Sequence, residues 1–134
     1  MKNLFFAMLA ITLTGVACSK KVDTPEDDVV GKWQWTMSVG GFSGHDTIRP
    51  PANTSVFLLL DSEGEYKKIS NGQSSAEGEY SVVGINSVFD NEEESAIRFD
   101  NSVGSEKIIG WDSGKLILVD NHTGAYATIY TRVH

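Results

Sequence analysis

Apolar and polar residues alternate with a period of two through most of the chain after Gly31. In residues 32–39 the apolar side chains fall at every second position: Trp33, Trp35, Met37 and Val39. Because a strand presents alternate side chains to opposite faces, these four would line one face and the polar residues between them the other. No segment after Gly31 keeps the three-and-four spacing of an amphipathic helix over about ten residues. The pattern predicts an all-β domain.

Turn residues divide this region into eight predicted strands. They cover residues 32–39, 55–60, 65–70, 77–83, 96–100, 105–111, 115–120 and 125–133. Asn71-Gly72 is the strongest hairpin signal, and tight turns are also expected at 61–64, 101–104, 112–114 and 121–124. Short antiparallel strands in a meander can close on themselves, which removes the exposed edges of the sheet. We therefore expect an eight-stranded antiparallel up-and-down β-barrel.

Two predicted connections are long, residues 40–53 and residues 84–95. Loops of this length on a compact barrel act as lids or are disordered. A seven-stranded sandwich is the structural alternative, but it needs more long crossing connections, and the paired cysteines of that fold are absent.

The N-terminus has the features of a bacterial export signal. Lys2 supplies a positive charge, residues 4–13 an apolar stretch, and residues 14–17 the small side chains that precede a cleavage site. Gly15-Val16-Ala17-Cys18 resembles the lipobox of bacterial lipoproteins, in which the thiol of the new first residue is acylated. Cys18 is the only cysteine in the chain, so it has no internal disulfide partner. We expect a lipoprotein signal peptide over residues 1–17 and lipidation at Cys18; the alternative is an ordinary secretory signal with an incidental cysteine.

Residues 18–29 connect this signal to the predicted barrel. They include Lys20, Lys21, Pro25 and an acidic cluster at 26–28, with no aromatic side chain to bury. Such a composition is typical of a disordered tether. The predicted organisation is a signal peptide over 1–17, an acylated cysteine with its tether over 18–29, and a single barrel domain over 30–134.

Charge limits the partners of the chain. It has 18 Asp and Glu against 11 Lys and Arg, a formal net charge of −7, so it would repel phosphate backbones and is not expected to bind nucleic acid. No uncharged stretch reaches the roughly 18 apolar residues that a spanning helix needs. The predicted membrane contact is a lipid bilayer reached through the acylated Cys18, with the domain itself in water.

Residue types that could support catalysis or metal binding occur without the required arrangement. Ser43, His45 and Asp46 are the residue types of a catalytic triad, but they crowd one Gly-rich loop, where ordering them would cost entropy. The three glutamates at 92–94 lack the alternating ligands and turn glycine of a calcium loop. The histidines, at 45, 122 and 134, do not have the spacing of a zinc site. We expect no catalytic residues, no metal and no cofactor.

Gly31-Lys32-Trp33 at the start of the first strand, together with Arg132 near the end of the last, resembles the lipocalin and calycin signature. In that family a Gly-x-Trp opens the first strand, and an arginine of the final strand packs on its indole. The resemblance implies that Gly31, Trp33 and Arg132 close one end of the barrel. The chain also looks like small lipocalin-like lipoproteins of Bacteroidota over residues 30–134, through four short motifs at 31–35, 40–44, 63–66 and 78–80.

The resemblance implies that the barrel holds a small apolar or amphipathic molecule. The candidate ligand-binding residues are Trp35, Met37, Phe42, Tyr66, Tyr80, Tyr126 and Tyr130. Arg132 has two interpretations, closure over Trp33 or pairing with a ligand carboxylate. An eight-stranded barrel is just wide enough to be filled by its own side chains or to hold one small ligand. A filled barrel acting as a structural or protein/glycan-interaction module of the cell envelope is therefore the alternative function.

The resemblance also implies a location. We expect a lipid-anchored monomer in the bacterial cell envelope, at the outer membrane, facing the periplasm. The periplasmic orientation is preferred because Lys20 and Lys21 occupy the places where surface-exported lipoproteins of Bacteroidota carry acidic residues. Display at the cell surface is the alternative orientation.

Overall fold

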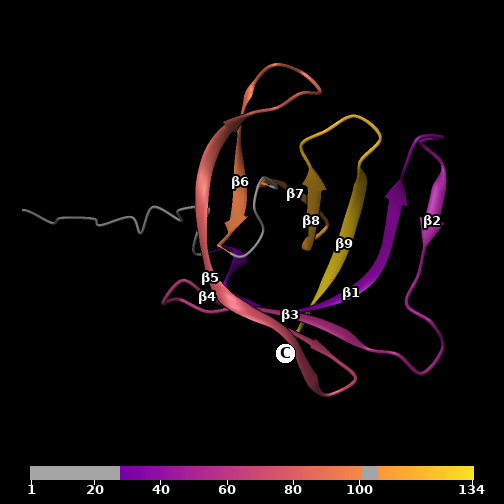
Figure 1. Cartoon of the computed structure of the whole chain (residues 1–134), viewed down its shortest axis with the longest axis vertical. Helices are drawn as coiled ribbons and strands as arrows, with labels where there is room; N and C mark the ends of the chain where they lie inside the picture. The colour runs from indigo at the N-terminus through magenta and orange to yellow at the C-terminus, as the bar shows by residue number, and fades with distance from the viewer. Residues whose placement is uncertain (1–27, 101–105) are drawn as a thin grey trace, which may run out of the picture.

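The computed structural model describes residues 28–100 and 106–134, and these form one antiparallel sheet (Figure 1). Its strands are β1 (Gly31–Gly40), β2 (Asp46–Ile48), β3 (Val56–Leu60), β4 (Glu65–Ser70), β5 (Gln73–Asn86), β6 (Glu93–Phe99), β7 (Glu106–Asp112), β8 (Lys115–Asp120) and β9 (Tyr126–Val133). The predicted signal peptide, Cys18 and the tether up to residue 27 lie outside the described residues, as do positions 101–105.

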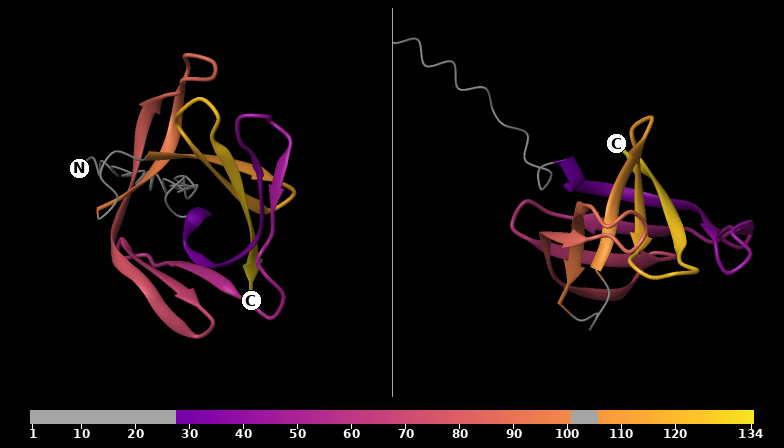
Figure 2. Two further views of the ribbon diagram at one scale, coloured as in Figure 1. Left: turned by 45° about the vertical axis from the view of Figure 1, so that its right-hand side comes forward. Right: turned by 90° about the horizontal axis from the view of Figure 1, so that it is seen from above.

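The sheet closes on itself. From β3 to β9 each strand pairs with the next, β1 pairs with β3, and β9 returns to pair with β1. The strands therefore follow one another around a ring, with the start of β1 beside the end of β9 (Figure 2). This confirms the predicted eight-stranded up-and-down barrel and is incompatible with two stacked sheets. The short β2 is an addition that pairs only with the far end of β1.

The hairpin between β4 and β5 forms at Asn71-Gly72, as predicted. Asn71 has φ of 51° and Gly72 has φ of 79°, and a two-residue type I′ loop requires positive φ at both central positions. Asparagine and glycine are the residues that accept this conformation at least cost. The register set by this turn holds for Ser70↔Gln73 and Ile69↔Ser74 and then shifts, so that Lys68 pairs with Ala76.

The second long connection is shorter than predicted. The ladder between β5 and β6 continues through Gly84↔Ser95, Ile85↔Glu94 and Asn86↔Glu93, so only residues 87–92 form the loop. The sequence pattern failed here because Glu93 and Glu94 were assigned to an acidic loop. Backbone pairing does not require apolar side chains, and charged residues are accepted at exposed or half-buried positions of a strand.

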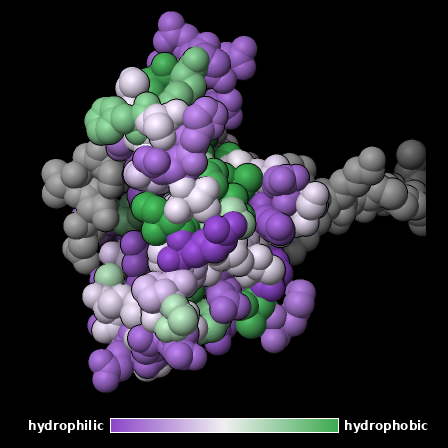
Figure 3. All heavy atoms as spheres, turned by 90° about the vertical axis from the view of Figure 1, so that its right-hand side faces the viewer, coloured by the Kyte–Doolittle hydropathy of each residue, from purple (hydrophilic) through white to green (hydrophobic). Residues whose placement is uncertain are grey.

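A bulge in β1 changes which residues line its inner face. The pairing with β9 shifts between Trp35 and Met37, so Thr36 is an extra residue in β1. The alternation moves by one position, and Ser38 follows Trp35 on the inner face while Met37 and Val39 turn outward. The expectation that Trp33, Trp35, Met37 and Val39 share one face is therefore wrong for the last two. Apolar side chains reach the surface between polar ones on this side of the barrel (Figure 3).

The packed core lies toward the end of the barrel where β1 begins. Its buried members are Val29, Trp33, Leu58, Leu60, Tyr66, Ile97, Phe99, Leu116 and Leu118. Val29 is fully buried although the tether was predicted to run through residue 29, so the ordered domain includes the last residues of that segment. Asp28 and Val29 have helical backbone and lie immediately before β1.

Trp33 and Arg132 meet at this end and form the seal. They are directly paired between β1 and β9, and the Arg132 guanidinium carbon lies 4.3 Å from the centroid of the Trp33 ring. Arg132 Nη1 donates to the Val30 carbonyl and Nη2 to the Asp28 carbonyl, each at 2.9 Å. Trp33 Nε1 donates to the Val29 carbonyl at 2.8 Å. The seal therefore fixes the chain before β1 across the end of the barrel.

Gly31 is required by this arrangement. Its φ is 151°, and a Cβ at this position would lie 2.7 Å from Arg132 Nη1. Any larger residue would move the guanidinium away from the carbonyls that it binds.

Replacing Arg132 with alanine should lower the free energy of unfolding by about 2–4 kcal/mol, because the cation–π contact and two charge-assisted hydrogen bonds are lost together. Arg98→Ala is the matched control, since the Arg98–Glu106 pair lies on the surface, where an ion pair contributes little to stability. Guanidinium denaturation followed by circular dichroism measures both. Equal losses in the two variants would contradict the role of the seal.

Candidate functional site

Charged and hydroxyl groups gather on the inner face of the barrel, and we call Lys68, Lys107, Asp120 and Tyr130 the inner polar cluster. The strand register places them inside, because directly paired residues share a face. Lys68 pairs with Leu58, Lys107 with Ile97, and Tyr130 with Leu116. The three leucine and isoleucine partners are buried, with at most 1% of their surface exposed. Asp120 pairs with Lys107 and follows the buried Leu118 by two positions.

Lys107 and Asp120 form an ion pair across β7 and β8. About a quarter of each side chain remains accessible to solvent, with exposures of 26% and 29%. The pair is therefore neither a fully buried ion pair nor a freely solvated one. The charges of Lys107 and Asp120 compensate each other, and neither compensates the charge of Lys68.

Lys68 extends from β4 into the interior without an ion-pair partner in residues 28–100 or 106–134. Its ammonium group lies 5.8 Å from the centroid of the Phe99 ring, a weak cation–π contact. Burial lowers the pKa of Lys68, repulsion from Lys107 lowers it further, and Asp120 offsets part of this. The barrel interior therefore disfavours the charged form of the Lys68 side chain.

Tyr130 supplies a hydroxyl to the same region. Burial, and secondarily the negative charge of Asp120, raise the pKa of Tyr130 to about 12. The phenol therefore stays protonated at any physiological pH and can both donate and accept a hydrogen bond.

A chain of hydrogen bonds continues the polar lining toward the far end of β1. Trp35 Nε1 donates to Ser38 Oγ at 3.1 Å, and Ser38 Oγ donates to Thr128 Oγ1 at 3.2 Å. Trp35 and Tyr130 are directly paired between β1 and β9, so the indole and the phenol are neighbours. This side of the interior can therefore present both aromatic surface and hydrogen-bonding groups.

The other predicted ligand-binding residues are dispersed. Tyr66 packs edge-on against Phe99 in the core, with ring centroids 4.7 Å apart, and the Tyr80 hydroxyl donates to the Asp61 carbonyl. Tyr126 pairs with Gly40 at the end of the barrel opposite the seal, and its hydroxyl donates to Asp46 at 3.4 Å. Met37 turns outward, and Phe42 is 99% exposed in the loop after β1. Of the seven, the structure thus brings Trp35 and Tyr130 together.

Sequence reasoning missed Lys68, Lys107 and Asp120, although a signal for them was present. Each lies two positions from a residue of the apolar set on its strand: Tyr66, Ile109 and Leu118. Counting alternate positions would have placed all three on the inner face.

The three residues that suggested a triad are engaged elsewhere. Ser43 Oγ accepts a hydrogen bond from the His45 backbone amide, and Asp46, in β2, accepts from the Tyr126 hydroxyl. All three are exposed. They sit on a loop and an edge strand rather than around a common reacting atom.

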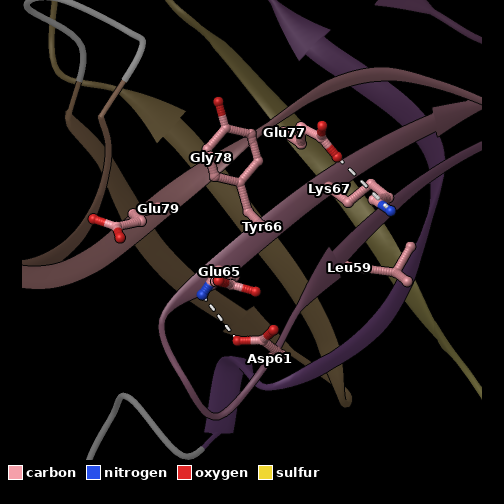
Figure 4. A pocket seen from close by; sticks show the side chains of 8 residues that line it. All are labelled: Leu59, Asp61, Glu65, Tyr66, Lys67, Glu77, Gly78 and Glu79. Carbon is pink, nitrogen blue, oxygen red and sulfur yellow. Dashed lines mark hydrogen bonds and ion pairs between the residues drawn. The ribbon is translucent and has the colours of Figure 1, made fainter.

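A groove lies on the outer face of β3, β4 and β5 (Figure 4). It has a volume of about 470 Å³ and is lined by Leu59, Asp61, Glu65, Tyr66, Lys67, Glu77, Gly78 and Glu79. Lys67 and Glu77 form a long, exposed ion pair of 3.8 Å across it. Four carboxylates against one lysine make this groove acidic. It is separate from the inner polar cluster, which lies on the opposite face of the sheet.

Carboxylates also group in two exposed loops, at Asp61, Glu63 and Glu65 and at Asp90, Glu92 and Glu94. In the first, Asp61 Oδ1 accepts hydrogen bonds from the backbone amides of Glu63 and Glu65, which is the ordinary role of an aspartate at a turn. Asp61 therefore has a structural role in its turn.

Comparison of the chain with protein-family models, curated proteins and solved structures gave no match. The closed eight-stranded antiparallel barrel is consistent with a lipocalin-like fold. Over residues 28–100 and 106–134, no helix has the length and apolar composition needed to cross a membrane.

Tyr130→Phe should change how stability depends on alkaline pH. Because folding raises the pKa of Tyr130 from 10.0 to about 12, the unfolded chain ionises first, so stability contributed by this phenol is complete below about pH 10 and is lost as the pH rises toward 12. Between pH 9 and pH 11, the free energy of unfolding of the unchanged protein should fall by about 1 kcal/mol more than that of Tyr130→Phe. Urea denaturation at each pH measures this difference, with Tyr126→Phe as the control that keeps Tyr130. If the free energy of unfolding depended on pH in the same way in all three proteins, folding would not raise the pKa of Tyr130.

Proposed function

We propose that this protein is a lipid-anchored, lipocalin-like binding module that holds a small apolar or amphipathic molecule inside its barrel. The observation that carries the proposal is the inner polar cluster, beside the aromatic pair Trp35 and Tyr130. Ligand sites in proteins combine apolar and aromatic walls with a few convergent polar groups, which is the composition found here.

The energetic cost of the cluster supports a functional interpretation. Transferring a charge from water into a protein interior is unfavourable unless it is paired, and a barrel filled only for stability would use apolar side chains. Lys68 remains in such a position without an ion-pair partner among the described residues. Groups retained at a cost to stability with shifted pKa values are concentrated at functional sites.

The lipocalin-like part of the proposal is supported by the seal. The Gly31, Trp33 and Arg132 combination that resembles the family motif coincides with the cation–π contact between β1 and β9. The lipid anchor is supported by the sequence around Cys18, which resembles a lipobox. Several acyl chains on one cysteine would hold the barrel at a bilayer surface, in the periplasm or at the cell surface.

Binding inside the barrel should be detected by tryptophan fluorescence. Titration with medium- and long-chain fatty acids and with small aromatic compounds should give a saturable change, because Trp35 lies on the inner face. Trp35→Phe should abolish most of that change, whereas Trp111→Phe should keep it, since Trp111 lies at the sealed end, tilted against the Trp33 ring and 43% exposed. Silence across the whole panel, or a response that survives Trp35→Phe, would contradict binding beside Trp35.

A second candidate function is an interaction module that uses the outside of the barrel. The acidic groove on β3, β4 and β5 favours it, because four carboxylates around a 470 Å³ depression would suit a positively charged partner segment. In this case the interior would be a structural core. The fluorescence titration separates the two candidates, since an exterior site predicts no response from Trp35.

Anchoring depends on one residue. In a bacterial host with lipoprotein-processing enzymes, the unchanged chain should enter the detergent phase on Triton X-114 partitioning and incorporate labelled palmitate. Cys18→Ser should incorporate none, because the thiol is the acylation site of a lipobox. Cys18→Ser protein that still carries palmitate would overturn the assignment of the anchor, and Ser19→Ala serves as a neighbouring control.

A further inference from the structure

We propose that a pocket at the sealed end of the barrel binds a zwitterion with an ammonium and a phosphate group. Arg132 would hold the phosphate, and Asp28 and Trp111 the ammonium. A phospholipid headgroup and a free aminoalkyl phosphate both have this chemistry. The inference goes beyond the proposed function, because the pocket is at the end of the barrel; only a membrane source for the ligand rests on the proposed lipid anchor.

Four residues line the pocket: Asp28, Trp111, Gly114 and Arg132. The segment before β1, the end of β7, the turn after it and β9 supply them, and the seal brings these elements together. The fully buried Trp33, whose ring both Arg132 and Trp111 contact, belongs to the core behind the pocket. The volume is about 290 Å³, near the lower limit for small-molecule pockets, which suits a compact polar ligand better than a long alkyl chain.

The pocket carries one charge of each sign, and these charges do not pair with each other. Within residues 28–100 and 106–134, neither the Arg132 guanidinium nor the Asp28 carboxylate forms an ion pair. The guanidinium binds the backbone carbonyl of Asp28 instead, which places the two charged side chains next to each other in the pocket wall. A simple anion or cation would satisfy one of the two charges, whereas a zwitterion would satisfy both.

Arg132 has donors to spare for a phosphate. Two of the five N–H groups of a guanidinium donate to the carbonyls of Val30 and Asp28, which leaves three for a ligand or water. Guanidinium groups bind phosphate oxygens through parallel, charge-assisted hydrogen bonds. The contact with the Trp33 ring and the two carbonyls hold this guanidinium in place before a ligand arrives.

Trp111 and Asp28 suit an ammonium group. Trp111 is 43% exposed, although its ring also packs against Trp33 with the centroids 5.8 Å apart, so a fixed indole surface faces the solvent. A cation over an indole ring is attracted by its π electrons. The Asp28 carboxylate is exposed and can accept charge-assisted hydrogen bonds from the same ammonium.

The pocket lies at the end of the barrel nearest the predicted anchor. Asp28 follows Cys18 by ten residues, and ten residues span at most about 36 Å even when fully extended. Acylation of Cys18 would therefore keep the pocket within that distance of the bilayer. Headgroups at such a high local concentration would occupy even a weak site.

The experiment compares a zwitterion with its two halves. The full acylated chain, in nanodiscs of a neutral galactolipid that offers no phosphate, is titrated calorimetrically with phosphoethanolamine, ethanolamine and methyl phosphate. Phosphoethanolamine should bind about tenfold or more tightly than either half, because only it engages both charges. Equal affinity for the three compounds, or no binding of phosphoethanolamine, would overturn the proposal.

Two variants test the ammonium side of the pocket. Asp28→Asn and Trp111→Leu should each weaken phosphoethanolamine binding by about threefold or more. Asp112→Asn removes the same charge outside the pocket lining, and Phe42→Leu removes an exposed aromatic ring in the loop after β1, so both should bind like the unchanged protein. Full affinity in Asp28→Asn and Trp111→Leu would overturn the site. If Trp111→Leu does not fold, Asp28→Asn against Asp112→Asn decides, since both carboxylates are exposed.

Repeating the titration in nanodiscs of phosphatidylethanolamine identifies the source of the ligand. Weaker apparent binding of phosphoethanolamine there would show that bilayer headgroups compete for the pocket, whereas unchanged affinity would assign the site to the free phosphate ester. The fatty-acid titration followed at Trp35 reports the barrel interior separately. Either site can therefore fail its test while the other passes.

Discussion

The contact between Trp33 and Arg132 is the interaction on which the rest of the structure depends. It joins the first strand of the barrel to the last, and a closed sheet has no unpaired edge. The same guanidinium binds the carbonyls of Asp28 and Val30, so the segment before β1 is held across the end of the barrel. Closure therefore fixes which side chains face inward on every strand, and with them the composition of the interior.

The interior that results is divided. Near the seal it is packed with apolar and aromatic side chains around Trp33, Leu58 and Leu116. Farther along β1 the bulge at Thr36 brings Ser38 inward, and its hydroxyl links Trp35 to Thr128. Charged groups from β4, β7 and β8 join this polar region. An apolar base beneath a polar lining is the arrangement that an amphipathic molecule would complement, and it is the physical basis of the proposed function.

Much of the fold could be predicted from the sequence because alternation and turn residues are local properties. The strands and the Asn71-Gly72 hairpin follow from them, whereas the meeting of Trp33 with Arg132 was implied by the resemblance to the lipocalin signature. The bulge could not be predicted, since Thr36 is fixed by a hydrogen bond to the carbonyl of Ile129 in the last strand. The site was harder still. Lys68 and Lys107 are individually ordinary strand residues, and only the register of the closed barrel brings them together.

The central claim is that the barrel interior, rather than its outer groove, is where this protein holds a ligand. A crystal structure of the chain grown with decanoate tests it most directly. The account predicts density for the ligand inside the barrel, beside Trp35 and Tyr130. An interior filled by the protein's own side chains, with decanoate absent or bound only in the groove on β3, β4 and β5, would contradict it.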